Sequence, residues 1–260
     1  MIRTLFIIAG GATVLAVGSL AGAAALGGSD LARNGGTWTF TETASDDGVR
    51  IRRGEAVDRG PAVTRTEAFT GGERLILDAP FDVTYVQGDA ATVRIEGPQA
   101  VVDRIRIDGA RISFDDDAPE SVTLRWGPNG ITGWSSLDGV KVTVTAPAVR
   151  DVEINGSADL DIQGYDQPSL DLRIAGSGEV RATGRTERLE VDIAGSGEAE
   201  LEGLEARDAD LSISGSGDID AAPTGQVAAA VSGSGDIRLR RQPASLNSSV
   251  SGSGDIWIDG

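Results

Sequence analysis

The sequence predicts an all-β protein whose C-terminal half forms a parallel β-solenoid, right-handed and with about 19 residues per coil. Three observations support this prediction. Glycine contributes 36 of the 260 residues, which few helices tolerate but turn-rich β structure accepts. Short apolar segments from about residue 66 onward alternate with period two, as strands with one buried face do. A glycine-centred motif also recurs at a nearly constant step.

The recurring motif is an Ile or Val, a turn resembling Gly-Ser-Gly, an Asp or Glu, and another small apolar residue. Its six copies span residues 154–160, 174–180, 193–199, 213–219, 231–237 and 250–256. Their first glycines are separated by 20, 19, 20, 18 and 19 residues. A step this constant is typical of a solenoid with one coil per repeat, and a flexible Gly/Ser linker has no such period.

Each copy predicts the same local structure, and residues 211–219 illustrate it. An extended chain would point Leu211, Ile213 and Ile219 inward, because side chains alternate along a strand. Gly215 and Gly217 would lie at a bend where neighbouring coils approach too closely for a side chain. The residues expected to point outward are Ser212, Ser214, Ser216 and Asp218.

The chain before the repeats is expected to contain a linker and then further β structure. Residues 29–65 are polar and glycine-rich and are interpreted as linker or irregular structure, with 37–41 as a possible short strand. Residues 66–260 are interpreted as one solenoid with its regular repeats at 151–260, so that 66–150 would be degenerate coils; a separate domain stays the alternative. Expected strands cover 75–77, 81–86, 93–95, 105–114 and 140–145, with a short helix over 99–108 as an alternative.

The N-terminal segment predicts export. Residues 1–28 contain a single charged residue, Arg3, followed by an apolar run and several alanines, a pattern typical of a secretory signal peptide. An uncleaved membrane anchor over residues 5–28 is the alternative, since the run is long enough to span a bilayer. Either way the rest of the chain would lie in the periplasm or at the cell surface, and would meet a membrane only through this segment.

Composition excludes several function classes. The chain has no His and no Cys, which removes His- or Cys-based zinc sites, thiol nucleophiles and Ser-His-Asp triads. The formal net charge of −17 argues against nucleic-acid binding and against docking on anionic lipid. No pair of catalytic carboxylates stands out from the repeats, so a glycan-acting enzyme is the least favoured function and no cofactor is expected.

The repeats and several strand segments resemble a family of bacterial exported proteins. The resemblance rests on the Gly-Ser-Gly-Asp/Glu-hydrophobic units, on residues 79–89, 93–97 and 142–147, and covers roughly residues 66–260. It is to the family named "putative auto-transporter adhesin, head GIN domain". It implies a β-helix-like fold, an exported life in a Gram-negative-type bacterium and no catalytic residues. The sequence departs from the family name in having no Gly-Ile-Asn tripeptide.

The first candidate site is a column of carboxylates at the same place in successive repeats. Stacked carboxylates repel one another, and calcium, which takes several oxygen ligands, would relieve that repulsion. The alternative is a solvated acidic edge that keeps the rod soluble. Residues 151–260 contain 21 Asp and Glu and 8 Arg, which gives a net charge of −13. The column begins at Asp159, and its calcium candidates are Glu179, Glu198, Asp218, Asp236 and Asp255.

Two further features suggest partners. Trp126 and Trp134 flank a Gly-Pro-Asn stretch and are expected in a binding loop, unless their indoles close the side of the solenoid. The last coil, with Trp257 facing outward, offers a strand edge for self-association, or a short edge that is simply solvated. The sequence therefore favours an adhesin-like, non-catalytic binding module with an envelope protein or glycan as partner; the alternative is a self-associating periplasmic structural or envelope-sensing protein.

Overall fold

The computed structural model describes residues 36–42, 49–53, 60–115, 121–127, 130–135 and 139–259. The chain divides into two compact units. Unit 1 comprises Met1–Arg59 and Asp116–Asp138, and unit 2 comprises Gly60–Asp115 and Gly139–Gly260. No helix in the described ranges is long and apolar enough to cross a membrane. The expected signal or anchor segment, residues 1–28, lies outside those ranges.

Unit 1 contains a four-stranded antiparallel sheet in the order β10-β9-β1-β2. Two of its strands come from the expected linker, and two are inserted between strands of unit 2. Because these strands pair with one another, the boundaries expected at residues 29–65 and 66–260 differ from those observed. The strands are β1 (Gly36–Glu42), β2 (Val49–Arg53), β9 (Ser121–Gly127) and β10 (Gly130–Ser135).

Unit 2 is the solenoid, which begins at Gly60 rather than at residue 66. Its first part holds β3 (Ala62–Ala68), β4 (Arg74–Asp78), β5 (Val83–Gln87), β6 (Thr92–Pro98), α3 (Gln99–Val102), β7 (Ile105–Asp108), β8 (Arg111–Phe114) and β11 (Lys141–Ala146). Its regular part holds β12 (Asp151–Gly156), β13 (Asp159–Gly176), β14 (Glu179–Gly195), β15 (Glu198–Leu201), β16 (Leu204–Gly215), β17 (Asp218–Ala221), β18 (Gln226–Gly233), β19 (Asp236–Leu239), β20 (Ser245–Gly252) and β21 (Ile256–Ile258).

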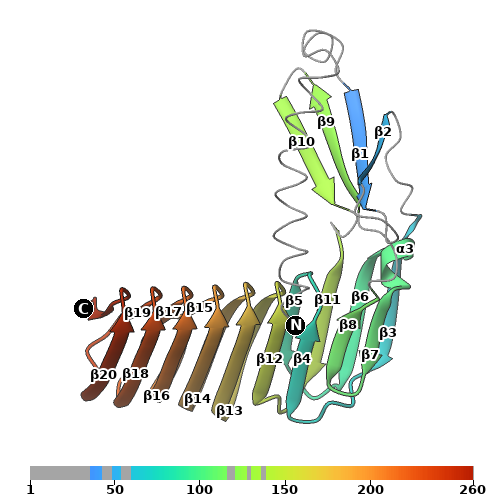
Figure 1. The fold of residues 1–260 in the computed structure, drawn as a ribbon. Coiled ribbons are helices and arrows are strands. Elements are labelled where there is room, and N and C mark those ends of the chain that lie inside the picture. Colours follow the sequence, from blue (N-terminus) through green and yellow to red (C-terminus); the bar gives the residue numbers. More distant parts are fainter. Residues whose placement is uncertain are drawn as a thin grey trace. The chain divides into compact units, whose positions relative to one another are not determined.

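The regular coils stack through two parallel ladders of strands, part of which Figure 1 shows as the row from β12 to β20. Ladder A consists of β8, β4, β12, the second halves of β13 and β14, then β16, β18 and β20. Ladder B consists of β11, β5, the first halves of β13 and β14, then β15, β17, β19 and β21. The predicted parallel β-solenoid is therefore confirmed, while its handedness stays a prediction.

The pairing is in register with the repeat, so equivalent residues stack. Ile154, Ile174, Ile193, Ile213 and Val231 form one interior column, each at most 2% exposed. The turn between the ladders needs glycine. Gly215 has φ +142°, and a Cβ on it would overlap the carbonyl oxygen of Gly195 in the previous coil. The predicted inward and outward residues of 211–219 are confirmed, with Leu211, Ile213 and Ile219 at most 1% exposed.

The first part of unit 2 joins the same solenoid but departs from its regular pairing. β4 and β5 form a coil beneath β12 and β13, and β8 and β11 form the coil before that. Antiparallel pairs β3–β6, β6–β11 and β7–β8 are added to these coils. The interpretation of this region as degenerate coils therefore holds for β4, β5, β8 and β11, and residues 99–108 split into α3 and β7 rather than forming one helix.

Two buried tyrosines contact backbone carbonyls near the junction of the first coils and the regular coils. The Tyr85 hydroxyl donates to the carbonyl of Ala146 at 2.9 Å, and the Tyr165 hydroxyl lies 3.0 Å from the carbonyl of Val149. Both side chains are 1% exposed. Burial raises the pKa of both phenols, so they remain neutral donors. Tyr85 thus holds the end of β11. The Tyr165 hydroxyl, which also lies 2.6 Å from the carbonyl of Ser169, lies against the segment between β11 and β12.

Candidate functional site

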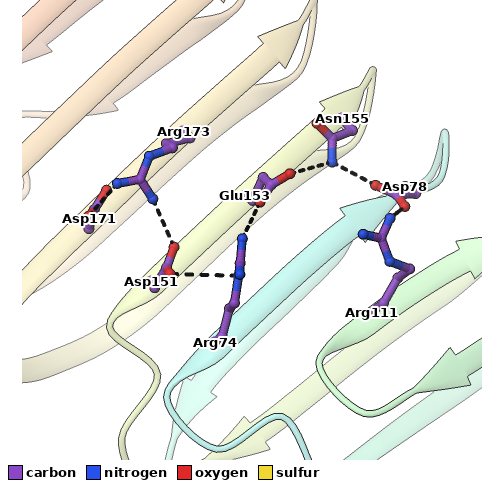
Figure 2. A network of polar contacts seen from close by, with 8 residues as sticks. All are labelled: Arg74, Asp78, Arg111, Asp151, Glu153, Asn155, Asp171 and Arg173. Carbon is purple, nitrogen blue, oxygen red and sulfur yellow. Dashed lines mark hydrogen bonds and ion pairs between the residues drawn. The ribbon is translucent and has the colours of Figure 1, made fainter.

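The outer face of ladder A carries a connected polar network over its first coils (Figure 2). Arg74 contacts Glu153 at 2.5 Å and Asp151 at 3.6 Å, and so joins β4 to β12. Arg173 contacts Asp151 at 3.1 Å and Asp171 at 2.8 Å, and so joins β12 to β13. The network extends to β8, where Arg111 forms an ion pair with Asp78.

Asn155 lies at the centre of this ladder A network. Its side-chain amide donates to Asp78 Oδ1 at 2.8 Å and to Glu153 Oε1 at 2.9 Å. The hydrogen bond from Asn155 and the nearby guanidinium of Arg74 lower the pKa of Glu153, against an opposing effect of burial. The carboxylates of β12 are paired with arginines of the strands on either side, so this surface carries little net charge.

The charge pattern of ladder A changes along the solenoid. Coils beyond Arg173 present Glu190, Asp192 and Asp210, which form no ion pair or side-chain hydrogen bond within the described part of the chain. In the last two coils the same outward places hold uncharged residues. These are Ala228, Ala230, Asn247 and Ser249. Ladder A therefore passes from paired charges to acidic residues and then to a neutral surface.

Ladder B carries the acidic column that the sequence predicts, in the predicted register. Its later aspartates bond to the backbone. Asp218 Oδ1 accepts the Asp236 N–H at 3.1 Å, and Asp236 Oδ1 accepts the Asp255 N–H at 2.9 Å. Each of these carboxylates thus satisfies a backbone donor of the next coil, a structural role for the column that needs no metal.

Glu198 lies among several other carboxylates of the column. Burial and the neighbouring carboxylates, Glu179 first and then Glu200, Asp218 and Asp220, raise its pKa. Arg181 offsets part of this negative charge by contacting Glu179 and, at 2.5 Å, Glu200. No group of three or more carboxylates in the described ranges is arranged to hold a metal ion. Calcium binding by Glu179, Glu198, Asp218, Asp236 and Asp255 stays a prediction, for which thermal melting with and without millimolar calcium is the test.

A shallow pocket lies at the far end of ladder B and brings the column together with Trp257. Its volume is about 150 Å³. The Arg238 guanidinium lies 4.9 Å from the ring centroid of Trp257 and 3.2 Å from Asp220. Arg240 contacts Asp220 at 3.1 Å and Asp259 at 3.3 Å. The pocket, hereafter the β21 pocket, is lined by Glu198, Asp218, Ile219, Asp220, Asp236, Arg238 and Trp257.

The β21 pocket was not identified from the sequence, although a signal for it exists. Arg238 and Trp257 occupy the same place in successive copies of the repeat, two residues after the acidic position, and they pair in register. Aligning the repeats beyond the motif places them side by side, next to the acidic column.

The structure corrects the expected tryptophan loop. Trp126 lies in β9 opposite Ile131, and Trp134 lies in β10 opposite Thr123, so both residues belong to strands of a hairpin. Strand-like runs flank a Gly-Pro-Asn-Gly sequence, a composition that favours a hairpin. The side chains of Trp126 and Trp134 lie outside the described part of the structure, and their binding role stays a prediction.

Comparisons with known proteins agree with this architecture. Residues 73–260 match the model of the family "putative auto-transporter adhesin, head GIN domain". The chain belongs to this family. A crystal structure of a putative adhesin from Bacteroides fragilis is 21% identical with TM-score 0.58, covering 76% of this chain and 97% of that one. This similarity supports the fold alone.

Two further solved structures are less similar. A putative adhesin from Parabacteroides merdae is 16% identical, with TM-score 0.44 and coverage of 76% of this chain and 96% of that one. A putative lipid binding protein from Parabacteroides distasonis is 18% identical, with TM-score 0.46 and coverage of 76% and 97%. The search of curated proteins gave no match.

Proposed function

We propose that the chain is an exported, non-catalytic binding module of the bacterial cell envelope or surface, which works as an adhesin does. Membership of the head GIN family supports a surface role. The N-terminal sequence pattern supports export. The absence of His and Cys from the sequence leaves few groups for catalysis near neutral pH.

One observation carries the choice of binding site. The β21 pocket combines a half-buried tryptophan with charged walls on rigid, in-register strands. Tryptophan is enriched at binding hot spots, and it supplies a flat apolar surface at little entropic cost. Before Trp257 the same column of ladder B carries charged side chains and no aromatic one; its residues are Asp161, Arg181, Glu200, Asp220 and Arg238.

The charge of the pocket indicates the chemistry of its ligand. Four carboxylates and one guanidinium line it, which leaves an excess of negative charge. The Arg238 guanidinium is already paired with Asp220 and stacked on Trp257. A ligand with a positively charged group would relieve the repulsion around Glu198, while its apolar or sugar part contacts the indole. A basic segment of an envelope protein or an amino-sugar glycan has this chemistry.

A fluorescence titration of the full chain tests the proposal. Trilysine and a chitosan oligomer are the charged probes, and neutral chitotriose is the uncharged one. We expect saturable quenching of tryptophan emission by the charged probes. Calorimetric titration, which does not use the indole as reporter, should give at least tenfold weaker binding for Glu198→Gln and for Trp257→Leu. Glu190→Gln removes the same charge from ladder A and should bind as the unchanged chain does.

The outcomes separate the site from general charge attraction. Equal weakening by Glu198→Gln and Glu190→Gln would show that net charge alone attracts the probes, and would reject the β21 pocket. Tight binding of neutral chitotriose that depends on Trp257 would keep the pocket and replace the cationic ligand by a neutral glycan. Absence of saturable binding for every probe would reject the pocket as the site for these ligand classes.

A further inference from the structure

The outer edge of β20 is a strand edge without the usual protection. It pairs with β18 on one side and with no other strand among the residues that the structure describes. Natural edge strands are commonly protected by charged residues, prolines or bulges. The β20 sequence, Ser-Leu-Asn-Ser-Ser-Val-Ser-Gly, contains no charged residue and no proline, and its eight residues continue the regular ladder.

Apolar surface accompanies this open edge. Val250 is 44% exposed, and no other large hydrophobic residue in the described part of the chain is as exposed. It ends the interior column that includes Ile154 and Val231, and Val231 is 2% exposed one coil earlier. Leu246, four residues before Val250, is half-buried. Another strand placed on β20 would cover both side chains.

The charges around the edge favour pairing through β20 rather than β21. On ladder A the nearest in-register carboxylate is Asp210, two coils from the edge. At about 4.8 Å per coil that distance is close to the Debye length in physiological salt. On ladder B, Asp255 and Asp259 flank β21 directly. Since the chain carries a net charge of −17, two copies would approach with least repulsion at the neutral edge of β20.

We propose that β20 pairs antiparallel with β20 of a second copy, which gives a two-fold symmetric dimer joined end to end. Such an interface is self-complementary, because the same strand provides both sides. Residues that face the solenoid interior in one copy must lie opposite residues that face the interior in the other. Leu246, Ser248 and Val250 are on that face of β20, so a pairing centred on Ser248 meets this requirement. Leu246 of each copy would then lie across from Val250 of the other, and Ser248 from Ser248. This dimer is independent of the β21 pocket and of its ligand.

Cross-linking of the full chain tests both the interface and its register. The sequence contains no cysteine, so an introduced thiol has no internal partner. Ser248→Cys should form a disulfide-linked dimer under mild oxidation, because the two thiols would lie opposite each other at the symmetry axis. Ala230→Cys is the control, since Ala230 is exposed on the outer face of ladder A and lies in β18, one coil from the edge.

Equilibrium sedimentation measures the association without cross-links. We expect the unchanged chain to approach twice its monomer mass as concentration rises. Ser248→Lys, which places two ammonium groups together at the axis, should weaken the dimer at least tenfold, and Ala230→Lys should not. A monomer at every concentration up to the millimolar range would overturn the proposal. A dimer that is equally strong with Ser248→Lys, or cross-linking by Ala230→Cys as efficient as by Ser248→Cys, would assign association to another surface.

Discussion

The first coils of unit 2 and its regular coils solve the same stacking problem by different means. In the regular coils each strand lies on a copy of itself 18 to 20 residues away, and identical apolar residues and glycines set the register. In the first coils β4 lies beside β12, about 77 residues later in the chain. There the ladder A network joins residues 77 and 79 positions apart, through Asn155–Asp78 and Arg74–Glu153.

The difference shows what a repeat can and cannot specify. A repeated sequence makes every coil compatible with its neighbours, but it also allows a slip by one whole coil. The first coils contain specific charged and amide pairs that only one register satisfies, and the later coils contain few. We therefore infer that the network fixes where the stack begins, and that the glycine and isoleucine columns propagate it.

The largest effect on stability is expected from adding a methyl group at the glycine turn between ladders A and B of a regular coil. Gly215→Ala forces a residue with a side chain into φ +142° and drives its Cβ into the backbone of the previous coil. We expect a loss of about 3 kcal/mol or more of unfolding free energy, measured by urea denaturation of the full chain.

Gly156→Ala is the matched control, because Gly156 has φ +120° at the equivalent turn of β12 but nothing within 4 Å of an added Cβ. Only the conformational cost should remain, about 1–2 kcal/mol. Equal losses for the two variants would show that coil-to-coil contact at the turn does not limit stability.

A second substitution tests the ladder A network by replacing Asn155 with the residue that the next coil has at the paired position. Asn155→Ala introduces the residue found at the paired position, Ala175. It removes both hydrogen bonds of the Asn155 amide and leaves Asp78 and Glu153 with fewer donors. We expect a loss of about 1–2 kcal/mol in urea unfolding. Ala175→Asn, the reverse change one coil later, should alter stability by less than about 0.5 kcal/mol, since substitutions at exposed places usually have small effects.

A third substitution addresses the regular coils through the acidic column. Asp236→Ala removes the acceptor of the Asp255 N–H and should cost about 1 kcal/mol of unfolding free energy. Asp236→Asn keeps a carbonyl acceptor and removes a charge between Asp218 and Asp255, so it should be as stable as the unchanged chain or slightly more so. If the Asn variant is as unstable as the Ala variant, the charge itself is required, which would favour a bound cation.

The sequence was sufficient to predict the features that recur in every copy of the motif. The inward place of Ile213, the glycine at position 215 and the register of the acidic column all follow from one motif in six copies. The Arg74–Glu153 contact could not be predicted, because no periodic signal links residues 79 positions apart. The placement of Trp126 and Trp134 in the two strands of a hairpin could have been predicted from the Gly-Pro-Asn-Gly sequence between them. The adjacency of Arg238 and Trp257 could likewise have been predicted from the repeat step.

The smallest expected effect is on the pH dependence of the unfolding free energy, which should have opposite signs for a carboxylate of the regular coils and one of the first coils. Glu198 of the regular coils has a raised pKa in the folded chain, caused by burial and then by Glu179 and other carboxylates. A raised folded pKa means that its stabilisation is present at low pH and is lost as the pH rises through that value. Glu198→Gln should therefore stabilise the chain at pH 7, and the gain should vanish near pH 3.

Glu153 of the first coils should behave in the opposite way. Its folded pKa is lowered by the Asn155 hydrogen bond and by Arg74, so its stabilisation is present above its ordinary pKa and is lost as the pH falls. Glu153→Gln should destabilise the chain at pH 7 and less so near pH 3, by about 0.5 kcal/mol at most because these groups remain in contact with solvent. Urea unfolding of both variants at the two pH values measures the differences. If both shift in the same direction, the two regions share one electrostatic character, and the ladder A network is not what distinguishes the first coils.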